Sequence, residues 1–277
     1  MDDNIKYLIG DILYGDDFSL EEIESWVKDE NEGYSNVIKK KKSVYEYPYY
    51  ELDKQFFFKY LPDMSKMRIL GIGSAYGCEF QPIIKRAKKI DIIEPSDLFF
   101  SNHIGGIPVS YVKPKPSGVI PFDDNTFDLI TCFSALHHIA NVSFVLKEIA
   151  RVLKPGGYLL HRDPIVSMRN PLQTIEDFQR PMPGLSKRER GIPLQYFRNT
   201  FEKLGFTYVS EKLIGMPTTR RLAKLISGKS PYNSKYWIGF DRIMSYLFQW
   251  NVQYSHGHIP KLFAICPQIV CNVLRKK

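Results

Sequence analysis

A glycine-containing turn and a carboxylate downstream of it are residues whose types and spacing suit ligand binding. The turn runs from Gly71 to Gly77 after the apolar segment MRILGI, and its small residues let a bound molecule approach the backbone closely. Glu94 ends a second apolar segment, KIDIIE, 17 residues after Gly77. A carboxylate there accepts hydrogen bonds from the hydroxyls of a ribose. Together they favour an adenosine-type ligand, without separating a nicotinamide cofactor from S-adenosylmethionine.

The residues around this turn alternate between expected strands and expected helices. Strands are expected at 67–72, 89–94, 107–112, 127–134, 158–163, 206–214 and 269–276, and helices at 78–86, 141–153 and 193–205. This alternation predicts an α/β fold, a doubly wound and mostly parallel seven-stranded sheet of Rossmann-like type with helices on both faces. Ligands of such sheets bind beyond the carboxyl ends of the strands, where the turn and Glu94 both stand.

Four segments are expected along the chain. They are a helical N-terminal region at 1–66, a core at 67–213, an aromatic and basic helical lid at 214–267, inserted between strands six and seven, and the last core strand at 268–277. Ser19 and Glu22 have the spacing of a helix capping box. In the insertion, five apolar residues fall at helical spacing: Phe240, Ile243, Leu247, Trp250 and Tyr254. They indicate either a helix packed on the body or a lid for a large or lipid-linked substrate at a membrane surface.

The net charge of +8 is concentrated near the end of the sequence, where residues 214–277 hold ten Lys/Arg and one acid. A basic region of this kind indicates phosphate, nucleic acid or an anionic membrane as partner, or a solvated surface. No apolar run has the length of a membrane span, no secretory signal stands out, and the four cysteines lack metal-ligand spacing. We expect a cytoplasmic protein without a metal site, with peripheral membrane contact as an alternative.

Two segments resemble a known family. They are IPFDDNTFDLITCFSALHHI at 120–139 and VLKEIARVLKPGGYLLHRDP at 145–164. The Pro-Phe-x-Asp-Asn-x-Phe-Asp run, the Leu-His-His after the fourth strand and the Lys-Pro-Gly-Gly before the fifth resemble the class I S-adenosylmethionine-dependent methyltransferases, specifically the UbiE-like, type 11 branch. The resemblance implies direct displacement of the methyl group from S-adenosyl-L-methionine by a nucleophile.

The resemblance also implies which residues hold the cofactor. Gly73, Ser74, Ala75 and Gly77 would lie beside its methionine part, Glu94 at the ribose, Pro95, Ser117 and Gly118 at the adenine, and Phe133, Ser134 and Leu136 along its other side. Three positions depart from the family pattern: Gly71 replaces an acid, Ala75 a glycine and Pro116 an aspartate. These departures leave a non-catalytic, methyltransferase-like binding module as an alternative.

Three residues at the ends of the fourth and fifth strands are candidates for a general base: His137, His138 and Asp163. An alcohol acceptor would benefit from such a base, whereas the two histidines have an alternative interpretation as scaffold residues. We expect a small-molecule or glycan/lipid-linked acceptor, methylated at oxygen.

Weaker likenesses bear on the choice of acceptor. GLSKRERGIP, at 184–193, and HRDP resemble methyltransferases of bacterial polysaccharide biosynthesis, and the Arg-rich loop around 180–190 suits a phosphorylated substrate. A nucleic-acid methyltransferase is a further alternative, although the Asn/Asp-Pro-Pro-Tyr/Phe motif is missing at 132–136. The glycine spacing argues against a nicotinamide dehydrogenase.

Overall fold

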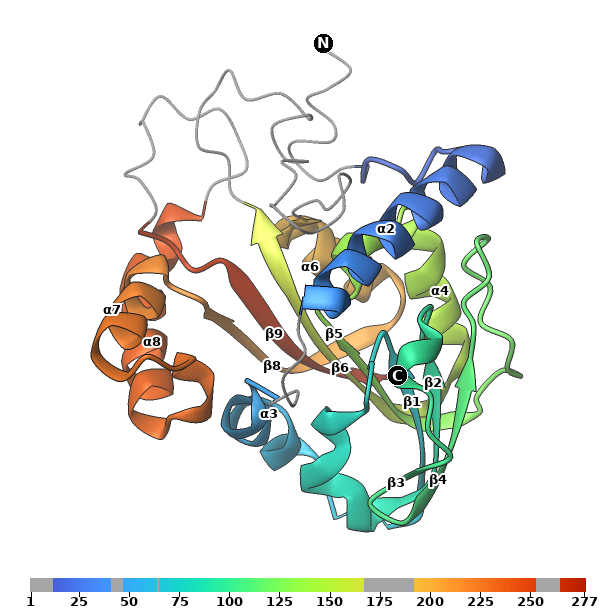
Figure 1. The fold of residues 1–277 in the computed structure, drawn as a ribbon, viewed down its shortest axis with the longest axis horizontal. Helices are drawn as coiled ribbons and strands as arrows, with labels where there is room; N and C mark the ends of the chain where they lie inside the picture. The colour runs from blue at the N-terminus through green and yellow to red at the C-terminus, as the bar shows by residue number, and fades with distance from the viewer. Residues whose placement is uncertain (1–11, 41–46, 64, 167–191, 253–264) are drawn as a thin grey trace.

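The computed structural model describes residues 12–40, 47–63, 65–166, 192–252 and 265–277 (Figure 1). The long strands of its sheet are β1 (Met67–Ile72), β2 (Ala87–Ile93), β4 (Ile107–Val112), β5 (Phe127–Phe133), β6 (Leu153–Val166), β8 (Phe206–Ile214) and β9 (Ile269–Lys276). These are the seven predicted strands. Two-residue strands, β3 (His103–Ile104) and β7 (Ile192–Pro193), bring the sheet to nine.

The strand order is β3-β4-β2-β1-β5-β6-β9-β8, with β7 paired to β6. Strand β9 runs antiparallel to both β6 and β8, and the other pairs of long strands are parallel. The chain leaves β1 towards β2 on one side and later returns to β5 on the other, so the order reverses between β1 and β5. The doubly wound, mostly parallel sheet is therefore confirmed, with the reversal at the place where such sheets bind ligands.

The predicted turn at Lys154–Gly157 lies inside β6 rather than before it. Leu153 pairs with Phe127 and Tyr158 pairs with Leu129, so the four residues between them form a bulge that β5 does not match. Gly156 has a φ of 77°, which glycine adopts at little cost.

Helices cover both faces of the sheet and pack on it through apolar side chains. On one face lie α4 (Val142–Val152) and α6 (Leu194–Lys203), and on the other lie α3 (Tyr50–Phe56) and the 3₁₀ helices η1 (Phe58–Tyr60) and η2 (Cys78–Arg86). Alternate residues of β1 serve the two faces, Leu70 facing α4 and Ile69 facing η2. The segment predicted as a helix at 78–86 is 3₁₀ and contains Pro82, which lacks a backbone N–H.

The N-terminal region contains one long helix, α2 (Leu20–Lys40), which lies near α4 in Figure 1. The predicted capping box is confirmed, because the Ser19 N–H donates to Glu22 Oε2 at 2.8 Å and the Glu22 N–H donates to Ser19 Oγ at 3.3 Å. Trp26 Nε1 donates to the His138 carbonyl at 2.8 Å, and the Ser143 N–H donates to Asp16 Oδ1 at 2.9 Å. These bonds fasten this region to the β5–α4 connection.

The insertion after β8 is helical, as predicted. It consists of α7 (Pro217–Ser227), η5 (Pro231–Asn233), α8 (Lys235–Phe248) and η6 (Gln249–Asn251), beside the β8 end of the sheet (Figure 1). Helix α8 packs on the body through Ile238, Asp241 and Ser245, whereas Phe240, Ile243, Leu247 and Trp250 of the apolar stripe are exposed. Tyr254, the Arg-rich loop and most of GLSKRERGIP lie outside the described residues. The four-part division of the chain remains a prediction.

No described helix is long and apolar enough to cross a membrane. The described residues also contain no group of three or more His, Cys, Asp or Glu side chains arranged to hold a metal ion.

Candidate active site

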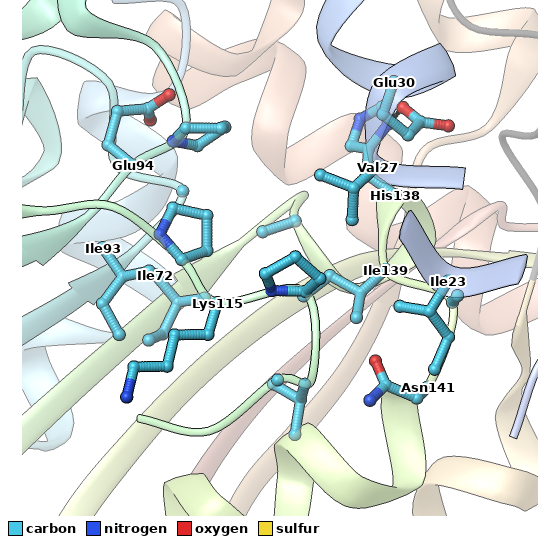
Figure 2. Close-up of a pocket in the computed structure, with 18 of the residues that line it drawn as sticks. Ile23, Val27, Glu30, Ile72, Ile93, Glu94, Lys115, His138, Ile139 and Asn141 are labelled. Atoms are coloured by element: carbon cyan, nitrogen blue, oxygen red, sulfur yellow. Dashed lines mark hydrogen bonds and ion pairs between the residues drawn. The ribbon is translucent and has the colours of Figure 1, made fainter. Parts of the chain in front are cut away.

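A cavity lies beyond the carboxyl ends of β1, β2 and β5, next to the reversal of strand order. Its wall combines the ends of these strands, the β4–β5 and β5–α4 connections and one face of α2 (Figure 2). Among the residues that line it are Ile23, Val27, Glu30, Gly73, Glu94, Pro95, Pro116, Gly118, Ser134, His138 and Asn141. Figure 2 shows Glu94 on one side of the cavity and Glu30 with His138 on the other. The rest of the wall is mainly apolar, so ligand polar groups would find partners at its two ends.

Glu94 is held in place by the turn that it faces. The Ala75 N–H donates to Glu94 Oε2 at 2.9 Å, and the Ser96 N–H donates to Oε1 at 3.1 Å. Burial raises the pKa of Glu94, while these two backbone donors oppose the rise. Each carboxylate oxygen keeps a further lone pair. The carboxylate is therefore fixed in orientation and able to accept two hydroxyl groups.

The turn between β1 and η2 depends on small residues. Gly73 and Gly77 have φ values of 65°, and Ala75 has a φ of 46°, in the left-handed region. A Cβ atom at Gly71 would come within 2.2 Å of Ser74 Oγ, so the turn is built around the glycine that replaces the family's acid. The Tyr111 hydroxyl donates to the Ala75 carbonyl at 2.9 Å. Gly71 and Ala75, two of the positions that depart from the family pattern, are thus part of the packing of this turn.

The β4–β5 connection forms another part of the cavity wall. The Asn141 side chain donates to the Ser117 carbonyl at 2.9 Å and thereby ties this connection to α4. Gly118 has a φ of 82°, and a Cβ atom there would lie 2.8 Å from Val145. Pro116, at the position where the family places an aspartate, lines the cavity without a side-chain hydrogen-bonding group.

Five of the predicted cofactor residues line the cavity: Gly73, Glu94, Pro95, Gly118 and Ser134. The other six are Ser74, Ala75, Gly77, Ser117, Phe133 and Leu136. These six are not among the residues that line it. Leu136 is fully buried, and Phe133 packs on Phe57 with ring centroids 4.7 Å apart. The structure therefore brings the predicted set to one edge of the sheet, with about half of it at the cavity surface.

The three candidate bases occupy different places. Asp163 is fully buried and accepts from the N–H groups of Leu136 and His137 at 3.1 and 3.2 Å; its Oδ1 also lies 2.6 Å from His137 Nδ1. Burial would raise the pKa of Asp163, but the interactions with His137 and the hydrogen bond from the Leu136 N–H outweigh this effect. The pKa of Asp163 therefore lies below its usual value. Of the three, His138 lines the cavity, and its Nδ1 lies 2.8 Å from Glu30 Oε2. The His137 and His138 rings are in contact, with centroids 4.0 Å apart and their planes tilted by 40°.

The contribution of α2 was not predicted from the sequence. Ile23, Val27 and Glu30 are spaced four and three residues apart, so they share one face of the helix, and that face borders the cavity. This spacing was visible in the sequence and predicts a shared face, but not the partner of that face. No residue of α7 or α8 is among the described residues that line the cavity, so the role of this insertion as a lid stays a prediction.

A buried polar cluster lies behind the cavity. The Arg162 guanidinium, at the end of β6, pairs with Asp53 of α3, and the Tyr47 hydroxyl donates to the same carboxylate. Burial raises the pKa of Asp53 to about 6 and that of nearby Glu79 to about 7. Ser74 lies beside Glu79 and lowers that pKa somewhat. The cluster thus places two acids with raised pKa values behind the glycine turn.

Comparison with known proteins finds a methyltransferase match in the middle of the chain. Residues 70–161 match a family model described as a methyltransferase domain. An uncharacterized methyltransferase of Bacillus subtilis, YcgJ, is 31% identical over 100 residues, which cover 34% of this chain and 39% of that protein. A demethylmenaquinone methyltransferase of Corynebacterium kroppenstedtii is 31% identical over 110 residues, covering 39% and 43%. The chain therefore spans about two fifths of the length of these curated relatives.

Solved structures agree on the fold. The [4+2]-cyclase SpnF is 15% identical, with a TM-score of 0.52 over 90% of this chain and 93% of that one. An S-adenosylmethionine-dependent methyltransferase assigned as putative, from Listeria monocytogenes, is 16% identical, with a TM-score of 0.52 over 82% and 96%. At these identities the likeness shows the fold alone. The match over residues 70–161 and the relatives support a class I S-adenosylmethionine-dependent methyltransferase domain of the UbiE-like, type 11 branch in this part of the chain.

Proposed function

We propose that this chain transfers a methyl group from S-adenosylmethionine to a small-molecule or glycan/lipid-linked acceptor. The observation that supports this proposal best is Glu94, fixed by two backbone N–H groups at the edge of a cavity whose opposite end carries Glu30 and His138. Glu94 would bind the ribose hydroxyls, Pro95 and Gly118 would lie along the adenine, and Gly73 and Ser134 would border the methionine part. When bound, S-adenosylmethionine supplies an activated methyl group, and the protein must align a nucleophile with it.

Oxygen is the acceptor atom that we propose. An alcohol becomes a better nucleophile when a nearby base takes its proton, and His138 offers an imidazole at the cavity wall. Glu30 orients that ring from α2, while Asp163 holds the neighbouring His137, whose ring contacts that of His138. Asp163 and His137 are positioning residues in this proposal, and His138 is the catalytic residue.

Carbon is the second candidate acceptor atom. A relative from Psychromonas ingrahamii, 40% identical over 70 residues, is named a C-methyltransferase of ubiquinone and menaquinone biosynthesis. Another, from Mycobacterium ulcerans, is named for phthiotriol and phenolphthiotriol dimycocerosates. These names concern lipid-like acceptors, and the apolar wall of Ile23, Val27 and Ile139 suits such a molecule as well as a glycan carried on a lipid.

Two of the three departures from the family pattern, Gly71 and Ala75, are compatible with cofactor binding. The turn keeps the left-handed conformation at Ala75, and its contact to Glu94 uses the backbone N–H, which alanine retains. Gly71 leaves room for Ser74, and Glu79 provides a carboxyl group behind the same turn. These observations favour an enzyme over a binding module.

Calorimetry tests the proposal. We expect S-adenosylhomocysteine to bind, and Glu94→Ala to weaken binding by about 1–3 kcal/mol, because a charged hydrogen-bonding group is lost. Glu202→Ala, on the exposed face of α6, is the matched control and should leave affinity unchanged. Equal affinity for wild type and Glu94→Ala would refute the assigned site, and lack of binding to wild type would favour the binding module.

A further inference from the structure

Two of the three residues that helix α8 buries against the protein body are polar. Its buried residues are Ile238, Asp241 and Ser245. The Asp241 carboxylate accepts from the N–H groups of Gly215 and Met216 at 2.6 and 3.0 Å, just before α7 begins. Because these bonds join the helix to the end of β8, the rotation of α8 about its own axis is fixed.

The opposite face of α8, continued by η6, carries an apolar stripe. Tyr236, Phe240, Ile243, Leu247 and Trp250 follow one another at spacings of four, three, four and three residues, and their exposed fractions are 91, 39, 57, 55 and 57%. At 100° per residue, their mean direction lies about 180° from the buried face. We call these five residues the outer stripe. A helix at a protein surface normally turns its apolar side inward, so α8 is inverted.

The surface around the outer stripe is basic. Lys235 and Arg242 are exposed on α8, on one side of the stripe, and exposed Arg221, Lys224 and Lys229 stand on or just after α7. The α7 helix adds two strongly exposed apolar residues, Leu225 and Ile226. Across the described part of the insertion, 215–252, the single acid is Asp241, which is buried against β8. The exposed part of these helices thus combines apolar and positive groups without a negative one.

We propose that α7 and α8 dock on an anionic lipid surface, with the outer stripe in the membrane interface and the neighbouring cations at the headgroups. Tyrosine and tryptophan suit the interface because each has an apolar ring and a polar edge. Lysine and arginine near an anionic leaflet each add attraction. A second copy of the chain fits less well, because two basic surfaces would face each other and repel. The docking goes beyond methyl transfer and needs no bound cofactor.

Vesicle co-sedimentation of the full chain tests the proposal. We expect binding to vesicles rich in phosphatidylglycerol, weaker binding to pure phosphatidylcholine vesicles, and loss of binding at high salt. Ile243→Ser/Leu247→Ser/Trp250→Ser should lower the partition coefficient roughly tenfold or more, because apolar area no longer leaves water. Val209→Ser removes an exposed apolar residue from β8 and should leave binding unchanged.

A second pair of variants separates charge at this site from total charge. Lys235→Glu/Arg242→Glu should lower binding to anionic vesicles roughly tenfold or more. Lys88→Glu/Lys203→Glu changes the net charge equally, at exposed positions on β2 and α6, and should lower binding much less. Quenching of Trp250 fluorescence by brominated lipid reports directly on insertion, and Trp250→Ser should abolish it.

Three results would overturn the proposal. They are failure to bind anionic vesicles, equal binding by the stripe variants and wild type, or a dimer in solution that Trp250→Ser dissociates. Thermal unfolding by circular dichroism shows whether each variant folds. If the triple variant does not fold, single substitutions at Ile243 and Trp250 take its place, and each should reduce binding roughly threefold or more.

Discussion

His138 Nδ1 lies 2.8 Å from Glu30 Oε2, although 108 positions separate the two residues in the chain. The contact joins α2 to the connection between β5 and α4, and both residues line the same cavity. One side chain can therefore influence two properties of the site, the position of the α2 wall and the orientation of the imidazole.

Glu30→Gln should lower turnover roughly tenfold, because a charge-assisted contact to His138 becomes a neutral one and the ring is less firmly oriented. Glu24→Gln, exposed on the same helix, is the control and should behave as wild type. Turnover and KM are measured with radiolabelled S-adenosylmethionine once an acceptor is found. Turnover that is the same in Glu30→Gln and Glu24→Gln would show that orientation by Glu30 is not needed.

His138→Asn should lower turnover of an alcohol acceptor by roughly 10²–10⁴-fold, the usual contribution of a general base. The affinity for S-adenosylhomocysteine, measured by calorimetry, should stay within about threefold of wild type, since binding itself needs no proton transfer. A loss of affinity with little change in turnover would instead assign His138 to the scaffold of the cavity.

Gly71→Ala should lower the free energy of unfolding by about 1–3 kcal/mol, because the added methyl overlaps Ser74 Oγ and Phe80. Adding Ser74→Gly should recover part of the loss. Gly239→Ala in α8 is the matched control: a Cβ atom there meets nothing within 4 Å, so it should be neutral or slightly stabilising. Urea unfolding checks all three, and equal effects of Gly71→Ala and Gly239→Ala would contradict the packing described for the turn.

Glu79→Gln should stabilise the protein at neutral and higher pH. Burial raises the pKa of Glu79 from 4.5 to about 7, so the folded state keeps a proton that the unfolded state has lost between these values. Its stabilising contribution is therefore present below pH 4.5 and declines as pH rises to about 7. Glutamine stays neutral, so the variant should lack this decline. Above a pH of about 7 its free energy of unfolding should exceed that of wild type by roughly 1–3 kcal/mol.

The comparison between Glu79→Gln and wild type is essential, because His161 acts in the opposite direction. Burial lowers the pKa of His161 from 6.5 to about 4, so its contribution to stability grows as pH rises between those values. Thermal unfolding of both proteins across the acid and neutral range isolates the Glu79 contribution. Parallel curves would mean that Glu79 titrates normally in the folded state.

Much of the fold could be predicted because its determinants are local. The apolar runs that became β1, β5 and β9 and the Ser19–Glu22 capping box depend on neighbouring residues, and the structure confirms them. The location of the candidate site could also be predicted, because Glu94 and the glycine turn both stand at carboxyl ends of adjacent strands.

The remaining features depend on contacts that no local pattern encodes. The placement of α2 over the cavity rests on Trp26 and Glu30 meeting residues more than 100 positions away. The outward rotation of α8 is set by one buried carboxylate, Asp241, bonded to the end of β8. A hydrophobic pattern predicts that α8 is a helix, but its apolar side would be expected to face inward.

The bond from the Ala75 N–H to Glu94 has an evolutionary consequence. The donor is a backbone group, so the carboxylate stays anchored whichever small residue occupies the position, provided that the chain keeps its left-handed turn there. An alanine in that conformation costs about 1–2 kcal/mol relative to its usual one, which a stable domain tolerates. Substitutions can thus accumulate in this part of a family's signature while the turn and the Glu94 carboxylate keep their geometry. A sequence search that demands every signature glycine would miss such proteins.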